Sequence, residues 1–373
     1  MSAGIYIHIP FCIRKCPYCD FYSEPFEKQL ADDYVRALCT HISSYREYSV
    51  KSDTIYFGGG TPSLLTPEQI GSILSAVNDN FIVEDAEITL EANPSSVNYE
   101  KLCEYRKAGI NRISFGVQSS DNSQLRFLGR LHDFDSAARA VYDAQRAGFD
   151  NISCDIMLGL SGQDMNSLNA TIDSITSLPI KHISAYMLKI EEGTAFDNDA
   201  VRSSVADDDL QCDMYLNTVK RLDNLGFEQY EISNFAKEHC YSRHNMKYWQ
   251  GEEYIGFGPA AHSYFNGQRF CSPRDIIKYI KSPLNTKIIT EINPDKTEEY
   301  IMLSLRLKQG ISLKKVCELG SEKHMEFIKN KAEMYAKNGL CVIDNDRISL
   351  TPKGFLVSNS IIFSFLESGS QKS

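Results

Sequence analysis

The feature that most constrains the fold is a repeated alternation of short β-branched runs with longer amphipathic runs between residues 4 and about 230. Strand-like runs lie at 4–9, 54–57, 86–91, 112–116, 151–157 and 182–188. Helix-like runs lie between and after them, at 28–48, 66–80, 99–108, 120–147 with a break near Gly129, 164–177 and 207–225. These six βα units predict an α/β fold whose parallel sheet closes fully or partly into a barrel.

Unusual residues gather at the carboxyl ends of the predicted strands. In chain order they are Cys12, Cys16 and Cys19, the glycine-rich run 58–62, Glu91, Gln118, Asp155 and Tyr186. The loops at this end of a βα barrel converge and carry its chemistry. We therefore expect these side chains to share one mouth of the barrel.

The three cysteines lie in one short loop with the spacing C-x3-C-x2-C. A cube of four irons and four sulfurs normally takes four cysteines, so this loop leaves one iron free to bind another group. A structural zinc site is the alternative, but it takes four ligands that are usually spaced in two pairs. The spacing favours a [4Fe-4S] cluster and leaves zinc open.

Composition limits the class of protein. The chain has 373 residues, 42% hydrophobic and 24% charged, which is typical of a soluble globular protein. We expect one domain of about 230 to 280 residues and a smaller one. No apolar run approaches the ~20 residues that cross a bilayer, and the short run before the cysteine loop does not resemble a signal peptide.

Cysteine usage and charge point to a compartment and exclude a partner class. The eight cysteines outside the loop are scattered without paired spacing, which indicates reduced thiols and a cytoplasmic protein. The net charge of -10 and pI near 5.4 argue against a nucleic-acid partner, because phosphate binding needs a basic face.

The pattern changes after residue 226. Residues 226–275 are rich in aromatic residues, glycine and histidine and hold the only tryptophan. Beyond them, helices are expected near 296–308, 312–319 and 322–338, followed by a hairpin of 340–343 and 347–350. A last helix should run from an N-cap at Thr351 to about Leu366, and the tail from Glu367 should fray. We predict domains at 1–235, 236–275 and 276–373, the last helical and winged-helix-like.

The cysteine loop resembles that of the radical S-adenosylmethionine (SAM) enzymes. Residues 6–10 and Cys19-Asp20-Phe21 resemble, more narrowly, the oxygen-independent coproporphyrinogen III oxidases and their HemW-type relatives, the heme chaperones. The resemblance implies that SAM chelates the open iron. It also implies reduction of the cluster to cleave SAM, and therefore an electron donor such as a flavodoxin or ferredoxin.

Carried over residue by residue, the resemblance assigns SAM binding to eight residues: Tyr6, Gly59, Gly60, Thr61, Glu91, Gln118, Arg130 and Asp155. Glu91 would pair with the ammonium group of SAM and Arg130 with its carboxylate, while Gln118 and Asp155 would meet the ribose or nearby polar atoms. Taken singly, the glycines also suit a tight turn, and Arg130 and Asp155 also suit ion pairs at the barrel rim.

Other residues bear on the branch of the family. Phe21 stands where the coproporphyrinogen oxidases carry a further cysteine, and five residues precede Tyr6 where those enzymes have an extension that engages substrate. The sequence His244-Asn-Met-Lys-Tyr248-Trp249 matches the H-N-x-x-Y-W signature of the HemW-type chaperones. Its aromatic rings can stack on a porphyrin, and an imidazole can bind heme iron. His262 and Cys240 are substitute ligands, and a structural, hydrogen-bonded His244 is the alternative.

We therefore expect a chaperone that binds heme and passes it to acceptor proteins, using a [4Fe-4S] cluster and SAM. The alternative is an oxygen-independent coproporphyrinogen III oxidase that decarboxylates coproporphyrinogen III to protoporphyrinogen IX. A third class is a zinc-stabilised interaction protein. A homodimer and peripheral association with a membrane are compatible with the chaperone interpretation.

Overall fold

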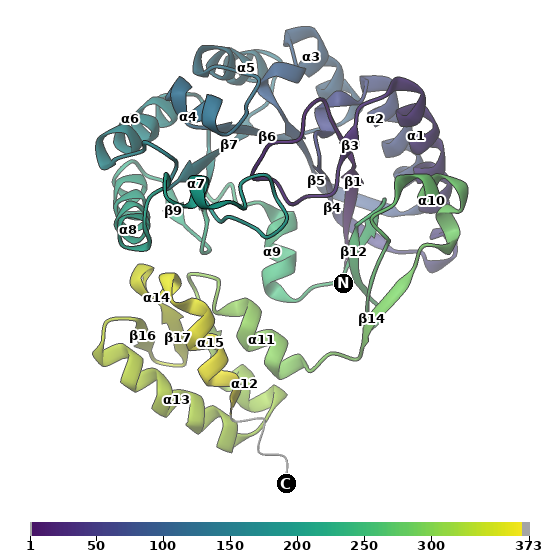
Figure 1. The fold of residues 1–373 in the computed structure, drawn as a ribbon. Coiled ribbons are helices and arrows are strands. Elements are labelled where there is room, and N and C mark those ends of the chain that lie inside the picture. The colour runs from purple at the N-terminus through teal and green to yellow at the C-terminus, as the bar shows by residue number, and fades with distance from the viewer. Residues whose placement is uncertain (1, 368–373) are drawn as a thin grey trace.

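The computed structural model describes residues 2–367, and a twelve-stranded sheet forms its body (Figure 1). The rest of the predicted frayed tail, residues 368–373, lies outside the described residues. Neighbouring strands run parallel in the order β11, β1, β4, β5, β6, β7 and β8. Their bounds are β1 Gly4–Ile9, β4 Lys51–Gly59, β5 Ile82–Ala92, β6 Arg112–Gln118, β7 Asn151–Leu158, β8 His182–Met187 and β11 Tyr254–Phe257. The α/β class and the run of parallel strands are confirmed.

Antiparallel strands extend this sheet at both ends. Beyond β8 lie β10 Asn234–Ala236 and β9 Glu228–Gln229, and beyond β11 lie β12 His262–Phe265, β13 Gln268–Cys271 and β14 Ile288–Ile292. The sheet therefore continues past the boundary predicted at residue 276.

Helices surround the outer side of the sheet (Figure 1). They are α1 Lys28–Ser43, α2 Pro67–Asn80, α3 Tyr99–Ala108, α4 Asn122–Phe127, α5 Phe134–Arg146, α6 Met165–Thr176, α8 Asp208–Asn224 and α10 Ile276–Lys281. Two further helices are α7 Asp199–Arg202, in the segment after β8, and α9 Arg243–Gln250, which packs against β1 and β4 near their amino ends. Short 3-10 turns lie at Arg46–Tyr48, Pro62–Leu64, Pro94–Ser96 and Pro283–Asn285. The predicted break near Gly129 separates α4 from α5. α2 begins with a capping box between Thr66 and Gln69.

The two faces of the parallel strands differ in chemistry. In β1, the side chains of Ile5, Ile7 and Ile9 are fully buried in the apolar core, whereas Tyr6 and His8 point the other way. Successive side chains of a strand alternate between faces. The apolar face packs beneath the helices, and polar side chains are left on the inner face of the curved sheet.

The C-terminal domain has its own small sheet. Its elements are α11 Lys296–Ser304, β15 Ile311–Ser312, α12 Leu313–Leu319, α13 Glu322–Lys337, β16 Cys341–Asp344, β17 Arg347–Leu350, α14 Pro352–Leu356 and α15 Ser358–Leu366. The predicted hairpin is β16–β17, to which β15 adds a third strand. The single last helix was a wrong prediction, because the chain turns at Val357 and forms two helices.

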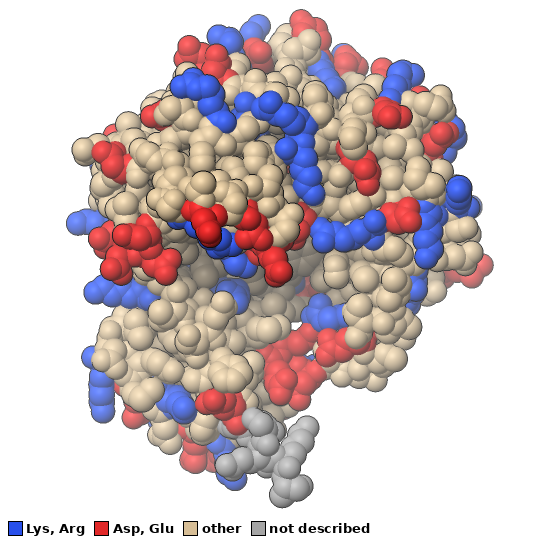
Figure 2. All heavy atoms as spheres, in the orientation of Figure 1, with Lys and Arg blue, Asp and Glu red and all other residues tan. Residues whose placement is uncertain are grey.

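Backbone hydrogen bonds join this domain to the main sheet. The Ile232 amide donates to the Arg306 carbonyl at 2.9 Å, and the Lys308 amide donates to the Tyr230 carbonyl at 3.1 Å. On the face drawn in Figure 2, basic and acidic side chains are interspersed, and the surface is hollowed between the two parts. Within residues 2–367, no helix combines the length and apolar character that crossing a membrane requires.

Candidate functional site

The three cysteines lie in the loop that follows β1. Cys12 belongs to β2 Phe11–Cys12, which pairs with β3 Glu24–Pro25 across the base of the loop. The Cys19 amide donates to the Cys16 carbonyl at 3.0 Å, so the second and third cysteines share a tight turn. All three thiols are half-exposed and outside any disulfide. Among the described residues, no three His, Cys, Asp or Glu side chains are placed to hold one single metal ion.

The glycine-rich loop after β4 fixes the position of the cysteine loop. The Gly60 amide donates to the Ile9 carbonyl at 2.9 Å, and the Thr61 amide donates to the Phe11 carbonyl at 2.8 Å. A Cβ atom at Gly60 would lie 2.6 Å from the Phe11 carbonyl oxygen, so only glycine fits here. The Thr61 hydroxyl lies 3.5 Å from the Cys12 sulfur.

Glu91 lies at the end of β5 on the inner face of the sheet. Its carboxylate accepts hydrogen bonds from the Tyr56 hydroxyl at 2.8 Å and from the Gly59 amide at 3.3 Å. Burial, with a smaller contribution from the nearby charge of Asp155, raises the pKa of Glu91 to about 7, against the hydrogen bond from Tyr56. Burial also raises the pKa of Asp155, against hydrogen bonds from Ser184 and Ser114. A nearby positive charge would stabilise the ionised form of these two buried carboxyl groups, so together they favour a cationic ligand.

Arg130 and Gln118 lie near Glu91 and Asp155, and we call these four residues the inner ring. Arg130 donates to the Gly116 carbonyl at 2.7 Å, and its other terminal nitrogen lies 3.6 Å from the Cys16 sulfur. Gln118 has a φ of +75° at a register shift in β6, a strained conformation of the kind that is concentrated at functional sites. Tyr186, at the end of β8, is 42% exposed.

Unpaired atoms in this ring provide a test of whether SAM fits. Within residues 2–367, the side-chain oxygen of Gln118 and Nε of Arg130 are buried without a hydrogen-bond partner. Buried polar atoms are nearly always paired, so such atoms at a functional site indicate a missing ligand. SAM is a zwitterion with a positively charged sulfur. The Gln118 oxygen can accept a hydrogen bond, and Arg130 can donate to a carboxylate. Beside the three thiols, Glu91 and Asp155 provide two acidic groups. The residues present therefore fit a [4Fe-4S] cluster and SAM.

The predicted heme motif lies on α9, across the amino ends of β1 and β4. His244 is 1% exposed, and its ring nitrogens are hydrogen-bonded to the Thr54 hydroxyl at 2.9 Å and the Tyr248 hydroxyl at 2.8 Å. Its ring stacks on that of Tyr56, with centroids 5.3 Å apart. Burial lowers the pKa of His244 to about 3. In this structure His244 is therefore a buried, hydrogen-bonded residue, as in the structural alternative.

The other heme candidates lie in different places. Tyr248 lines an open cleft of about 700 Å³, and Trp249 is half-buried outside the lining of that cleft. His262 also lines the cleft. Cys240, by contrast, is half-exposed beside the Glu238 carbonyl.

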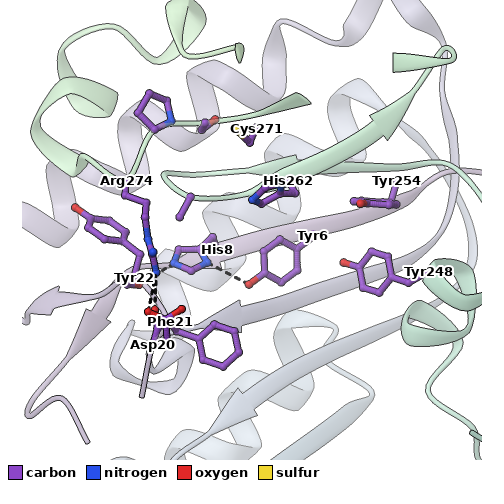
Figure 3. A pocket seen from close by; sticks show the side chains of 13 residues that line it. Tyr6, His8, Asp20, Phe21, Tyr22, Tyr248, Tyr254, His262, Cys271 and Arg274 are labelled. Carbon is purple, nitrogen blue, oxygen red and sulfur yellow. Dashed lines mark hydrogen bonds and ion pairs between the residues drawn. The ribbon is translucent and has the colours of Figure 1, made fainter. Parts of the chain in front are cut away.

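Figure 3 shows this cleft between the inner face of β1, the end of the cysteine loop and the β12–β13 hairpin. Tyr6 and His8 form the β1 side. His8 is hydrogen-bonded through one ring nitrogen to the Tyr6 hydroxyl at 3.1 Å and through the other to the Tyr22 carbonyl at 3.0 Å. Burial lowers its pKa to about 4, which keeps it neutral. Because Tyr6 is also one of the predicted SAM-binding residues, the cleft adjoins the predicted SAM site.

Several site residues were missed by the sequence reasoning. Tyr56 and His8 could have been found, because each lies two positions from a predicted inward residue, Gly58 and Tyr6 respectively. The β12–β13 hairpin also had a signal: Asn266-Gly267, both with positive φ, is the dipeptide of a two-residue hairpin turn. Nothing in the local sequence indicated that Arg274 reaches the cysteine loop.

Comparisons with known proteins agree with this site. Residues 6–175 match the family model described as the radical SAM superfamily, and residues 293–357 match the HemN C-terminal domain. The heme chaperone HemW of Bacillus subtilis is 33% identical over 97% of this chain and 98% of its own length. HemW of Escherichia coli is 38% identical over 69% of each chain.

The solved structure of coproporphyrinogen III oxidase (HemN) from Escherichia coli has a TM-score of 0.83. The match covers 98% of this chain and 90% of that chain at 21% identity. This likeness establishes the fold that the two proteins share.

Proposed function

The chain belongs to the radical SAM superfamily and, within it, to the family of the HemW heme chaperones, and on this basis we propose that it binds heme and passes it to acceptor proteins. The observation that carries the proposal is the similarity to chaperones of this name along nearly the whole chain. The fold shared with a coproporphyrinogen oxidase does not decide the activity, because one fold hosts many functions.

Membership of the superfamily implies a [4Fe-4S] cluster and SAM. We propose that Cys12, Cys16 and Cys19 hold the cluster, which leaves one iron for SAM. When bound, the two groups supply one-electron chemistry that no side chain provides. The two backbone hydrogen bonds from the glycine-rich loop to residues 9 and 11 support this assignment, because they hold the cysteine loop rigidly.

The inner ring would orient SAM. Glu91, whose pKa is raised by burial, would receive the ammonium group, and Asp155 would meet the ribose or nearby polar atoms. Arg130 would bind its carboxylate, and the free oxygen of Gln118 would accept a hydroxyl hydrogen. Tyr6, Gly59, Gly60 and Thr61 would border the methionine part.

A protein of this superfamily needs a reductant, and we propose a flavodoxin or a ferredoxin. The outer turn of the cysteine loop, Ile13-Arg14-Lys15, is exposed. Two cationic side chains and one apolar side chain beside the cluster suit an acidic electron carrier.

The heme motif would act through Tyr248. Its hydroxyl is fixed by His244, and its ring lines the cleft, so we propose that His244 positions Tyr248 against heme. A heme contact of Trp249, a homodimer, peripheral membrane association and a cytoplasmic location stay predictions from the sequence.

The function is tested with anaerobically reconstituted protein. We expect heme titration to give a saturating Soret band, and coproporphyrinogen III to remain unconverted. Formation of protoporphyrinogen IX would overturn the chaperone proposal and support the oxidase alternative. Colourless protein that contains zinc and no iron after anaerobic purification would support the interaction-protein alternative.

A further inference from the structure

We propose that heme is bound in the cleft between β1 and the β12–β13 hairpin, with His262 as the ligand of its iron. The inference rests on the proposed function and assigns its binding site. Its starting point is that His244 and His8, the buried histidines nearest to the cleft, have both ring nitrogens in hydrogen bonds. Neither ring can bind iron without giving up a buried hydrogen bond.

The cleft has a suitable size and lining for a porphyrin. Its volume of about 700 Å³ lies within the range of roughly 300–1,000 Å³ that is usual for small-molecule sites. Its walls carry aromatic rings that come from four separate segments of the chain: Tyr6, Phe21, Tyr22, Tyr248 and Tyr254. Flat, apolar rings of this kind favour contact with a flat macrocycle.

His262 is the available imidazole in this cleft. It is exposed, and within residues 2–367 its ring makes no side-chain hydrogen bond that would have to be broken. The hairpin places Cys271 directly opposite His262 in the antiparallel register, so both side chains lie on the same face. Figure 3 shows both on the hairpin side of the cleft, facing the strand that carries Tyr6 and His8.

The choice between the two donors follows from their exposure. Both imidazole and thiolate bind heme iron, but the ring of His262 is exposed, whereas Cys271 is only half-exposed. We therefore assign the iron to His262. Cys271 is half-exposed and unoxidised beside it, and it is the donor that the experiment must exclude.

Arg274 supplies a cation for the carboxylates of heme. Its side chain is 55% exposed at the rim, where it donates to the Asp20 carbonyl and lies 3.7 Å from the Asp20 carboxylate. A guanidinium group has five donor hydrogens, so donors remain for a propionate. Phe21, the neighbour of Asp20, is 65% exposed and adds an apolar ring to the lining of the cleft.

The first experiment titrates heme into the cluster-loaded, full-length protein under anaerobic conditions. We expect His262→Ala to weaken heme binding roughly tenfold or more and to shift the Soret band, with the iron-sulfur absorbance unchanged. His239→Ala, at an exposed histidine outside the cleft, is the matched control and should titrate like the wild type. Cys271→Ser should keep the wild-type Soret position.

The outcomes separate the site from the function. If the wild type takes up no heme, the proposed function fails. If it binds heme and His262→Ala binds equally well with the same spectrum, only the assignment to the cleft fails. Loss of the wild-type spectrum in Cys271→Ser, with its retention in His262→Ala, would also overturn the assignment to His262.

A second experiment tests the orientation of heme without relying on the iron ligand. Arg274→Met should weaken binding of heme by roughly three- to tenfold, because a charge-assisted contact with a propionate is lost. It should leave the binding of heme dimethyl ester, which has no free carboxylates, unchanged. An equal loss for both ligands, or no loss for either, contradicts the proposed contact.

Discussion

Replacement of Gly60 by alanine should damage the cysteine loop without changing any of its cysteines. The new methyl carbon would lie 2.6 Å and 2.8 Å from the carbonyl oxygens of Phe11 and Ile9, and 2.9 Å from the Phe11 nitrogen. Ordinary contacts begin at 3.4 Å, so the backbone must move by 3.4 − 2.6 = 0.8 Å. All three atoms belong to the backbone, and no side-chain rotation can relieve the overlap.

The magnitude follows from two losses. Overpacking of this kind costs about 1–3 kcal/mol, and weakening of the hydrogen bond from the Gly60 amide to the Ile9 carbonyl adds about 1 kcal/mol. We expect the free energy of unfolding to fall by about 2–4 kcal/mol. The iron content after anaerobic reconstitution should fall as well, because Cys12 directly follows Phe11.

The matched control is Gly71→Ala. A methyl group on Gly71, within α2, would meet no atom within 4 Å. Alanine is favoured over glycine inside a helix by about 1 kcal/mol, so this variant should be slightly more stable and keep its iron. Urea denaturation and iron analysis of both variants provide the test. A Gly60→Ala protein with wild-type stability and iron content would refute the reasoning.

Three further predictions concern single side chains. Arg130→Met should weaken SAM binding to the cluster-loaded protein, measured by calorimetry, by about 1.5–3 kcal/mol, and an unchanged affinity would remove Arg130 from the site. Burial raises the pKa of Glu231 to about 7, so at pH 6 the folded protein holds a proton that the unfolded chain has released. The free energy of unfolding should therefore fall as pH rises from about 4.5 to 7, by up to about 3 kcal/mol. Glu231→Gln should flatten this slope in denaturation measured at pH 5 and pH 7.5, and an identical slope would contradict the assignment. His244→Ala should lower stability by about 2–4 kcal/mol and weaken heme binding through Tyr248, yet keep the wild-type Soret position; a shifted band would instead make His244 the iron ligand.

The parallel strands were predictable because their signal is local. Each strand is short, β-branched and separated from the next by an amphipathic helix. The spacing of hydrophobic residues and the length of each run are therefore enough to place the strand. The carboxyl ends of parallel strands meet at one edge, so chain order alone predicted that Glu91, Gln118 and Asp155 would lie near one another. Arg130 follows no strand directly, and only the family resemblance pointed to it. The hydrogen bonds and pKa shifts of these side chains could not be predicted from the sequence.

The antiparallel end of the sheet was harder to predict. Strands β12 and β13 are four residues each, and β14 is exposed at every position, so none shows the alternation that reports a buried face. The state of His244 was also hidden, because its partners, Thr54 and Tyr248, include one that is 190 residues away in sequence. Such a pair is created by the fold and leaves no local pattern.

The separation of apolar and polar faces in the parallel sheet has an evolutionary consequence. Ile5, Ile7 and Ile9 contribute to the core that holds the helices, while Tyr6 and His8, their immediate neighbours, contribute nothing to that core. Substitutions at the inward positions can therefore change what the mouth of the sheet binds, while the apolar contacts beneath the helices are kept. One scaffold can in this way be adapted to different ligands by changes at alternate residues of the same strands.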